Sequence, residues 1–214
     1  KRYLVKSTIG IHNALTYTYP MSIKSAHLEH IFSWLEKKTQ LSSTLKADIQ
    51  KIARLRHIEK GELLFEQGKN ITEVFYVVSG CMRAFQTDEK GKEHTMSFNT
   101  QNFWLCDYKG LYLESTGSIS SDALEDSQVL AFNMLDLECL YVKHPELATV
   151  GRGFLQRHVA TLHDRILDQL RLTAKERYDL FLKKYAHIEQ IAANRYIASY
   201  LGITQQSLSR LRAT

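Results

Sequence analysis

The fold of this chain is decided by two glycine-bounded stretches, Gly61-Glu-Leu-Leu-Phe-Glu-Gln-Gly68 and Val74-Phe-Tyr-Val-Val-Ser-Gly80. Each contains a short apolar run and closes on glycine, which is typical of a strand that ends in a tight turn. Further strands are predicted at residues 54–58, 81–87, 93–98 and 129–132, with a turn at residues 88–92. Short strands at such spacing predict a small antiparallel barrel or jelly roll.

Helices are predicted on both sides of this barrel. Apolar residues recur at helical spacing within residues 22–39, and Ser42 or Ser43 is placed to cap a second short helix. Beyond the barrel a long helix is predicted from Pro145 to about residue 171, because proline is favoured at the first helical position. The fold class is therefore α+β, a jelly-roll barrel combined with helices.

The long helix carries a short apolar seam. Leu155, Val159, Leu162 and Ile166 follow a four-three-four spacing, which is the pattern of a helix that packs against another helix. The alternative is one face of a core helix within a single chain. A helix of about 26 residues is about 39 Å long, more than a barrel of this size needs. We therefore favour a homodimer with these four residues at its interface.

The net charge sits at one end of the chain. The total is +5, from 28 Lys and Arg against 23 Asp and Glu. Residues 1–170 hold 20 basic and 20 acidic side chains, whereas residues 171–214 hold eight basic and three acidic ones. A neutral body with a basic end predicts contact with a polyanion.

Inside that basic segment, residues 197–212 have a helix-turn-helix pattern. Helices are predicted at residues 174–184, 195–201 and 205–212. Gly202 supplies the positive φ that lets the chain reverse between the last two helices, and Thr204 is placed to cap the last one. A recognition helix of this kind presents its first turns to base edges in the major groove.

The residue types in those first turns suit DNA. Glutamine can bond adenine and arginine can bond guanine through two hydrogen bonds each, and hydroxyl groups serve bases or phosphates. The predicted DNA-binding residues are Thr204, Gln205, Gln206, Ser207, Arg210, Arg195 and Arg212, and Lys175, Arg177, Lys183 and Lys184 are further candidates for phosphate contacts. The alternatives are a plain helical hairpin with a glycine cap and a solvated basic face.

Four blocks in this order resemble the Crp/Fnr family of bacterial transcription regulators: the two stretches quoted first, Ala123-Leu-Glu-Asp-Ser-Gln-Val-Leu130, and residues 197–212. The resemblance covers about residues 25–212. It implies a double-stranded β-helix effector domain of the cyclic-nucleotide-binding kind at residues 21–143. A dimerisation helix at residues 144–172 and a helix-turn-helix domain at residues 173–214 follow, and residues 1–20 are an extension of unknown role.

The implied partners are double-stranded DNA, a second copy of the chain, RNA polymerase and a small-molecule effector of unknown identity.

Family members that bind cyclic nucleotides carry Gly-Glu and, about ten residues later, Arg followed by Ser or Thr. Here Cys106-Asp107 stand in place of Gly-Glu, Gly117 in place of the arginine and Ser118 in place of the hydroxyl residue. With Tyr108 these residues form the candidate effector pocket. A buried phosphate needs that arginine, so cyclic AMP is not expected to bind.

Other features exclude several classes of protein. Cys81, Cys106 and Cys139 are far apart with no Cys-x-x-Cys pair, which argues against a disulfide framework or a structural zinc site and fits a reducing cytoplasm. No cysteine precedes Cys81, so the iron–sulfur cluster of oxygen-sensing members is not expected, and no metal or other cofactor is predicted. No apolar run reaches the length of a membrane span, and no known catalytic motif is present.

Two other functions stay open at this point. One is a signalling protein that keeps the barrel and the dimer helix without binding DNA. The other is a cupin-type metalloenzyme, although only His57 and His94 fall in the barrel region. Residues 185–196 leave little room for a wing hairpin, so the DNA-binding domain is expected to be compact, or the chain truncated.

Overall fold

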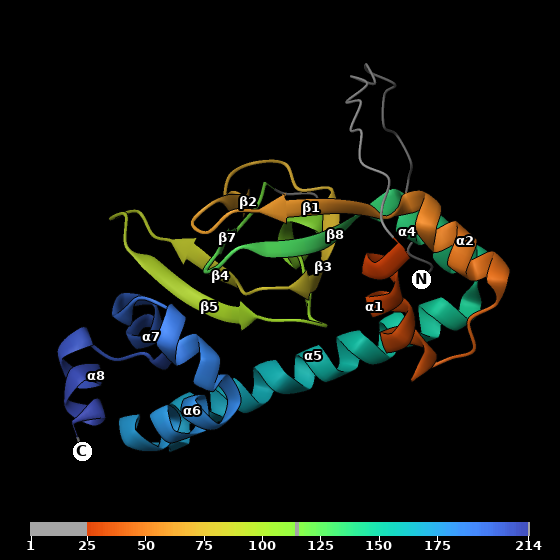
Figure 1. Cartoon of the computed structure of the whole chain (residues 1–214). Coiled ribbons are helices and arrows are strands. Elements are labelled where there is room, and N and C mark those ends of the chain that lie inside the picture. Colours follow the sequence, from red (N-terminus) through yellow and green to blue (C-terminus); the bar gives the residue numbers. More distant parts are fainter. Residues whose placement is uncertain (1–24, 114–115, 214) are drawn as a thin grey trace, which may run out of the picture.

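A barrel of short strands lies between two groups of helices, and the long helix α5 (Pro145–Arg171) runs along it from one group to the other (Figure 1). This computed structural model describes residues 25–113 and 116–213. The predicted extension at residues 1–20 lies outside the described residues. The bounds of α5 confirm the predicted long helix at both ends.

The barrel consists of two four-stranded antiparallel sheets, in the strand orders β1-β8-β3-β6 and β2-β7-β4-β5. This arrangement confirms the predicted jelly roll. The sequence did not predict β6 and β7, because the first has two residues and the second is a serine-rich run without apolar alternation. The strands are β1 (Arg54–Ile58), β2 (Leu63–Phe65), β3 (Glu73–Ser79), β4 (Met82–Thr87), β5 (Glu93–Asn99), β6 (Trp104–Leu105), β7 (Ser120–Ala123) and β8 (Ser127–Asn133).

Apolar side chains fill the interior of the barrel. β3 pairs with β8 so that Phe75 lies opposite Ala131 and Val77 opposite Val129, and all four are at most 2% exposed. Phe65 on β2 stacks on Phe75 with 5.7 Å between the ring centroids. The alternation of inward and outward residues along each strand therefore gives the barrel a packed core of its own.

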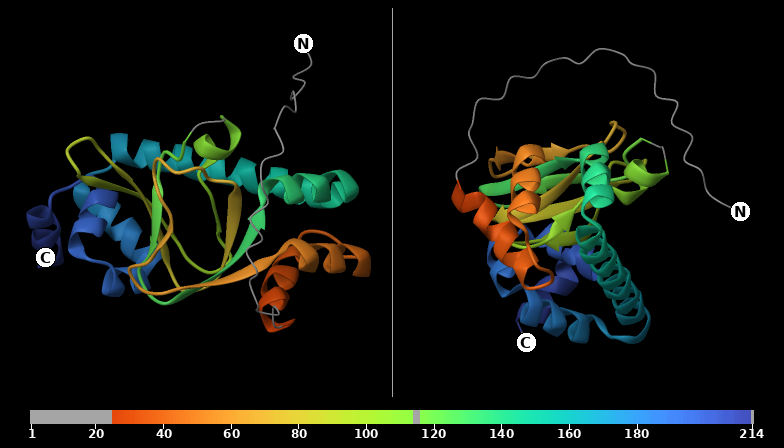
Figure 2. Two further views of the ribbon diagram at one scale, coloured as in Figure 1. Left: turned by 90° about the horizontal axis from the view of Figure 1, so that it is seen from above. Right: turned by 90° about the vertical axis from the view of Figure 1, so that its right-hand side faces the viewer.

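A second apolar core lies outside the barrel. Helices α1 (Ser25–Glu36), α2 (Ser43–Ile52) and α4 (Met134–Lys143) gather at one end of it (Figure 2). With the start of α5 they pack on the outward side chains of the sheet, where Tyr76, Leu130 and Phe132 are at most 1% exposed. The central strands of this sheet, β3 and β8, are thus buried on both faces.

Polar contacts fix α2 in this core. Ser42, one of the two predicted caps, accepts a hydrogen bond from the backbone N–H of Leu45 at 3.1 Å. The carboxylate of Asp48 accepts one from Lys143 Nζ at 2.6 Å and lies 2.9 Å from His144 Nε2. These contacts join α2 to the junction between α4 and α5.

Three helices follow α5 at the other end of the barrel: α6 (Ala174–Ile191), α7 (Asn194–Leu201) and α8 (Gln205–Arg212). The predicted helix over residues 174–184 ends at a kink at Tyr185, where φ is −136° and ψ is 37°. A further helical segment, which the sequence did not predict, follows this kink to Ile191 within α6. Tyr185 and Ile188 are buried with Phe181 in a third apolar cluster. Burial of these side chains holds the kink and the helical segment after it against the rest of the cluster.

One turn of the barrel gives a test of the fold. Gly80 has a φ of +85°, and a Cβ there would lie 2.7 Å from Ser127 Cα, whereas Gly91 has a φ of +76° with open space around it. Gly91→Ala is expected to lower the free energy of unfolding by about 1 kcal/mol, the cost of a positive φ. Gly80→Ala adds steric overlap and is expected to cost about 3 kcal/mol or more. Urea unfolding followed by circular dichroism measures both, and equal losses would contradict the described packing.

Candidate DNA interface and effector pocket

The turn between α7 and α8 has the geometry that the sequence predicted. Gly202 ends α7 in the left-handed region, with φ 68° and ψ 34°, and a Cβ there would lie 3.0 Å from Gln169 Oε1 on α5. Thr204 caps α8, because its Oγ1 accepts a hydrogen bond from Ser207 N–H at 3.1 Å. The chain therefore reverses at Gly202 and begins α8 with a capped N-terminus.

A small core fixes the angle between the two helices. Ile197, Ala198, Leu201 and Leu208 are at most 2% exposed, and they pack in one cluster with residues of α6. Ala198 has the small side chain that close approach of the helices requires. Ile203, which the sequence suggested as part of this core, is only partly buried at its edge. The pair α7 and α8 thus forms a packed helix-turn-helix.

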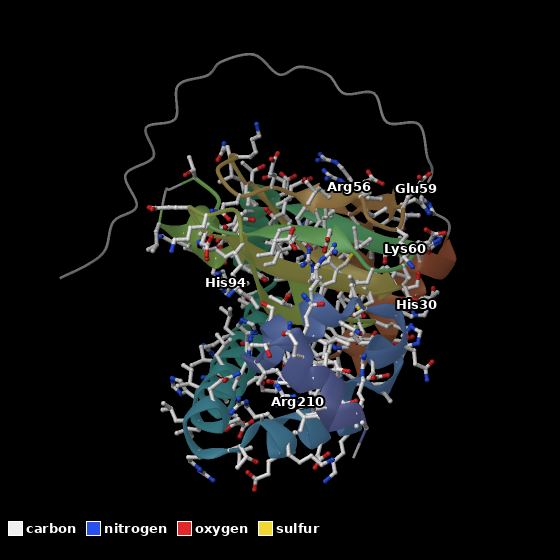
Figure 3. The ribbon with its side chains drawn as sticks, turned by 90° about the vertical axis from the view of Figure 1, so that its left-hand side faces the viewer. His30, Arg56, Glu59, Lys60, His94 and Arg210 are labelled. Atoms are coloured by element: carbon white, nitrogen blue, oxygen red, sulfur yellow. The ribbon has the colours of Figure 1, made fainter. Side chains whose placement is uncertain are left out.

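The exposed side of α8 presents polar side chains to solvent. Gln205, Gln206 and Arg210 are exposed, and their side chains make no hydrogen bond or ion pair with any other residue in the described part of the chain. Arg210 points outward from α8 in Figure 3. Ser207 differs from these three, because it is partly buried and its hydroxyl lies 3.0 Å from Thr204 Oγ1. Three of the predicted base-reading residues are therefore available to a ligand.

The predicted phosphate contacts divide into two groups. Arg212 is engaged by Glu189, with 2.7 Å between Nε and Oε1, and by Asn194 Oδ1 at 2.6 Å. Arg177 donates to the carbonyl oxygens of Leu172 at 2.6 Å and Leu201 at 3.0 Å. These two arginines therefore hold the helices together.

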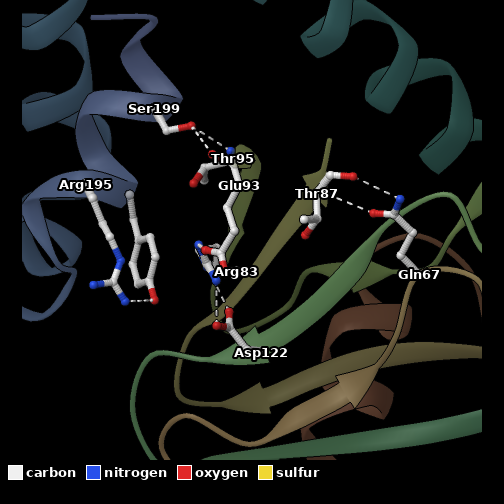
Figure 4. A network of polar contacts seen from close by, with 9 residues as sticks. Gln67, Arg83, Thr87, Glu93, Thr95, Asp122, Arg195 and Ser199 are labelled. Carbon is white, nitrogen blue, oxygen red and sulfur yellow. Dashed lines mark hydrogen bonds and ion pairs between the residues drawn. The ribbon is translucent and has the colours of Figure 1, made fainter. Parts of the chain in front are cut away.

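The other basic side chains of this region are exposed. Arg195 stacks on the ring of Tyr196, and its Nη2 lies 2.7 Å from the tyrosine hydroxyl (Figure 4). Lys175 pairs with Asp179 at 2.9 Å, and Lys183 and Lys184 are exposed on α6. Since exposed ion pairs contribute little to stability, these charges remain able to meet an anion.

Helix α7 is docked on strand β5 of the barrel. Thr95 N–H donates to Ser199 Oγ at 2.9 Å, and that hydroxyl donates to the carbonyl of Glu93 at 3.2 Å (Figure 4). Arg165 of α5 donates to the carbonyls of Met96 and Tyr200. These hydrogen bonds fix the helix-turn-helix against both the barrel and α5.

Arg83 strengthens this junction and was missed by the sequence reasoning. Its guanidinium donates to both carboxylate oxygens of Asp122, at 2.9 and 2.7 Å, and to Glu93 at 2.7 Å, while its side chain is 1% exposed. It lies 3.9 Å from the ring of Phe85 and 3.5 Å from that of Tyr196 on α7. Burial alone lowers the pKa of Arg83, but its bonds to the two carboxylates outweigh burial and raise that pKa. The available signal was an arginine within the apolar run of residues 81–85.

The candidate effector pocket contains a closed anion site. Asp107, 2% exposed, caps α3 (Tyr108–Tyr112) and accepts hydrogen bonds from Gly110 N–H at 3.0 Å, Ile119 N–H at 3.1 Å, and the N–H and hydroxyl of Ser118. Burial raises the pKa of Asp107, but these bonds together outweigh it and hold the pKa below its usual value. The chain's own carboxylate thus occupies these donors.

Gly117 is closely surrounded beside this site. Its N–H donates to the carbonyl of Lys69 at 2.8 Å, and a Cβ on it would lie 2.7 Å from Ile71 Cδ1. Cys106 and Tyr108 line a different space, an apolar cavity outside the barrel. The structure therefore brings Asp107, Gly117 and Ser118 together and separates them from the other two predicted pocket residues.

The predicted interface residues of α5 form a stripe in water. Leu155, Val159, Leu162 and Ile166 are 40%, 49%, 42% and 57% exposed. Leu170, which the heptad spacing did not include, is 77% exposed near the end of the same helix. These large apolar side chains are only partly covered within the described part of one chain.

No metal site or membrane span is found in residues 25–113 and 116–213. Within these ranges no group of three His, Cys, Asp or Glu side chains could hold a metal ion, and no helix is long and apolar enough to cross a membrane. His94 pairs with Asp88, and His57 lies beside Gln128. No observation therefore favours the cupin alternative.

Comparisons with known proteins agree on one kind of relative. The profile of the family described as Cyclic nucleotide-binding domain matches residues 55–144. Transcriptional activator protein Anr of Pseudomonas protegens is 27% identical over 171 residues, which cover 75% of this chain and 69% of Anr. Transcriptional activator protein FnrA of Stutzerimonas stutzeri is 28% identical, with the same coverage. Among solved structures, FixK2 of Bradyrhizobium japonicum has the same fold with a TM-score of 0.65 and 21% identity, covering 76% of this chain and 83% of FixK2.

Proposed function

We propose that this chain, which belongs to the Crp/Fnr family of transcription regulators, controls transcription as a homodimer bound to a two-fold symmetric site on double-stranded DNA. Its relatives are regulators of transcription, and no residue here is assigned a catalytic role. The proposed division of the chain is the one that the sequence predicted, with a barrel at residues 21–143, a dimer helix at 144–172 and a DNA-binding domain at 173–214.

The observation that carries this proposal is the exposed side of α8. Gln205, Gln206 and Arg210 stand without partners in the described chain on a capped helix, in the segment that holds the whole net charge. Unpaired amide and guanidinium groups in this position suit the paired donors and acceptors of adenine and guanine in the major groove. Arg195 and the lysines of α6 supply candidate phosphate contacts, which fix the register of a protein on DNA.

The stripe on α5 supports the homodimer. Two copies that pair along Leu155, Val159, Leu162 and Ile166 present two recognition helices related by a two-fold axis. Half-sites are then expected about 34 Å apart, one turn of the duplex. RNA polymerase and a small-molecule effector remain proposed partners, and a reducing cytoplasm remains the proposed location.

The recognition residues can be tested by DNA binding. The operator is first selected from random duplexes with the intact chain, and Kd is then measured at several salt concentrations. Arg210→Ala and Gln206→Ala are each expected to weaken binding by about 5- to 150-fold, equivalent to about 1–3 kcal/mol for a lost base contact, and to relax selectivity at one position. Arg157→Ala, an exposed arginine on α5, is the matched control and leaves Kd unchanged. Wild-type affinity in both α8 variants would contradict the proposal that this helix contacts the bases.

The closed anion site predicts that the barrel does not bind cyclic nucleotides. Asp107 takes the donors of Gly110, Ser118 and Ile119, and Gly117 stands where members that bind cyclic nucleotides carry an arginine. A phosphate there would face a buried carboxylate without a cation. Calorimetry with cyclic AMP and cyclic GMP is expected to show no binding at micromolar concentrations. A clear isotherm would contradict the described role of Asp107.

A further inference from the structure

A cavity of about 330 Å³ lies outside the barrel, where α1, α2, α3, α4 and α5 meet the sheet of β3, β6 and β8. This volume is within the range of small-molecule sites. The wall is largely part of the apolar core, since Leu35, Ile49, Phe132 and Leu140 are at most 6% exposed. It is therefore a space built into the core and distinct from the closed anion site of Asp107.

Aromatic rings dominate one side of this cavity. Trp34 and Trp104, which are both tryptophans of the chain, lie with their ring centroids 6.2 Å apart, and Phe154 of α5 packs 6.5 Å from Trp104. Tyr108, Tyr112 and Tyr141 also line it. Such walls favour an apolar molecule.

The polar groups inside this wall are uncharged. Burial raises the pKa of the Cys106 thiol and of the Tyr141 phenol, each to about 12, and raises that of Tyr108 further. Glu138 and Arg152 are exposed, so charges occur only at the rim. A charged ligand group would therefore lose its hydration without gaining a buried counter-ion.

One donor in the cavity is unused. The hydroxyl of Tyr141 makes no hydrogen bond with another residue in the part of the chain that the structure describes. It lies beside Gly151 of α5, where a Cβ would come 3.0 Å from it. The absence of a side chain at Gly151 leaves this hydroxyl room to bond a ligand.

We propose that this cavity binds an uncharged, largely apolar small molecule that carries a hydrogen-bond acceptor, with the acceptor on Tyr141. Leu147, Val150 and Phe154 bring the first half of α5 into the wall, and Leu155 of the dimer stripe also lines the cavity. The rest of the stripe and the contact of Arg165 with α7 lie further along the same helix. A ligand in the cavity therefore contacts the helix that positions the two recognition helices. This regulatory consequence rests on the proposed function, whereas the binding itself does not.

Energy transfer from the two tryptophans measures binding directly. The probe is N-phenyl-1-naphthylamine, which is uncharged, and its 8-sulfonate, 8-anilino-1-naphthalenesulfonate, differs from it by one negative charge. The intact chain is expected to bind the uncharged probe at least tenfold more tightly than the sulfonate. Methyl decanoate, an uncharged ester, is expected to displace the probe, and the decanoate anion is not. Absence of energy transfer, or equal binding of both probes, overturns the proposal. A cavity filled by a second copy of the chain would give the first of these results.

Variants locate the site. Ala148→Phe fills the cavity and is expected to weaken probe binding at least tenfold, whereas Thr149→Phe, an exposed neighbour on α5, is the matched control and leaves it unchanged. Tyr141→Phe keeps the ring and removes the donor. This variant is expected to weaken the binding of methyl decanoate about fivefold, which is the effect of one hydrogen bond. Its affinity for the naphthylamine is expected to change less than twofold. If Ala148→Phe fails to fold by circular dichroism, Tyr141→Phe decides, and an unchanged affinity for the ester overturns the role of its hydroxyl.

The regulatory consequence has a separate readout. Saturating methyl decanoate is expected to change the Kd for the selected operator at least fivefold, and an unchanged Kd overturns that consequence. Probe binding by a chain that binds no DNA would leave the cavity assignment intact and contradict only the proposed function.

Discussion

The long helix α5 carries an apolar stripe that the rest of the described chain covers only in part. The four seam residues remain 40–57% exposed, and Leu170 is 77% exposed. Burial of the remaining half of each seam side chain is worth about 1 kcal/mol per residue, and a two-fold dimer gains this on both copies. The first half of the same helix packs in the core beside the barrel, through Leu147 and Val150. One helix therefore links the inside of each chain to the proposed dimer.

The DNA-binding helices depend on α5 and the barrel for their position. Arg165 ties α5 to β5 and α7, Ser199 ties α7 to β5, and Arg83 reaches Tyr196 from the outward side of β4. The Arg83 contacts depend most on their partners, because a buried guanidinium needs both its carboxylates to offset the loss of hydration. The orientation of α8 is thus set by polar contacts made at a distance from it.

Much of this fold is predictable from the sequence, since apolar periodicity and glycine positions mark β1 to β5, β8 and α5. Gly202 and Thr204 likewise mark the helix-turn-helix by local rules of φ and capping. What escaped prediction depends on contacts between distant residues. Beyond the kink at Tyr185, residues 186–191 form a second helical segment with Ile188 buried, and neither local propensity nor the Lys183-Lys184 pair shows this. The Arg83 junction joins barrel strands to α7, and its contact with Tyr196 spans more than a hundred residues of sequence.

The candidate pocket shows the same limit. The sequence places Cys106, Asp107 and Tyr108 in one site, but successive side chains leave the backbone in different directions. Asp107 turns to the N–H groups of Ser118 and Ile119, and its neighbours line the outer cavity. Which space a side chain enters follows from the packing of α3 and could not be read from the order of residues.

Sedimentation equilibrium of the intact chain and of Leu162→Arg tests the central claim most directly, which is that the α5 stripe joins two copies. We expect a wild-type dimer, a folded Leu162→Arg monomer, and a dimer for Ala160→Arg, an exposed control on another face of the helix. A monomeric wild type at tens of micromolar, or a Leu162→Arg variant that remains dimeric, would contradict it.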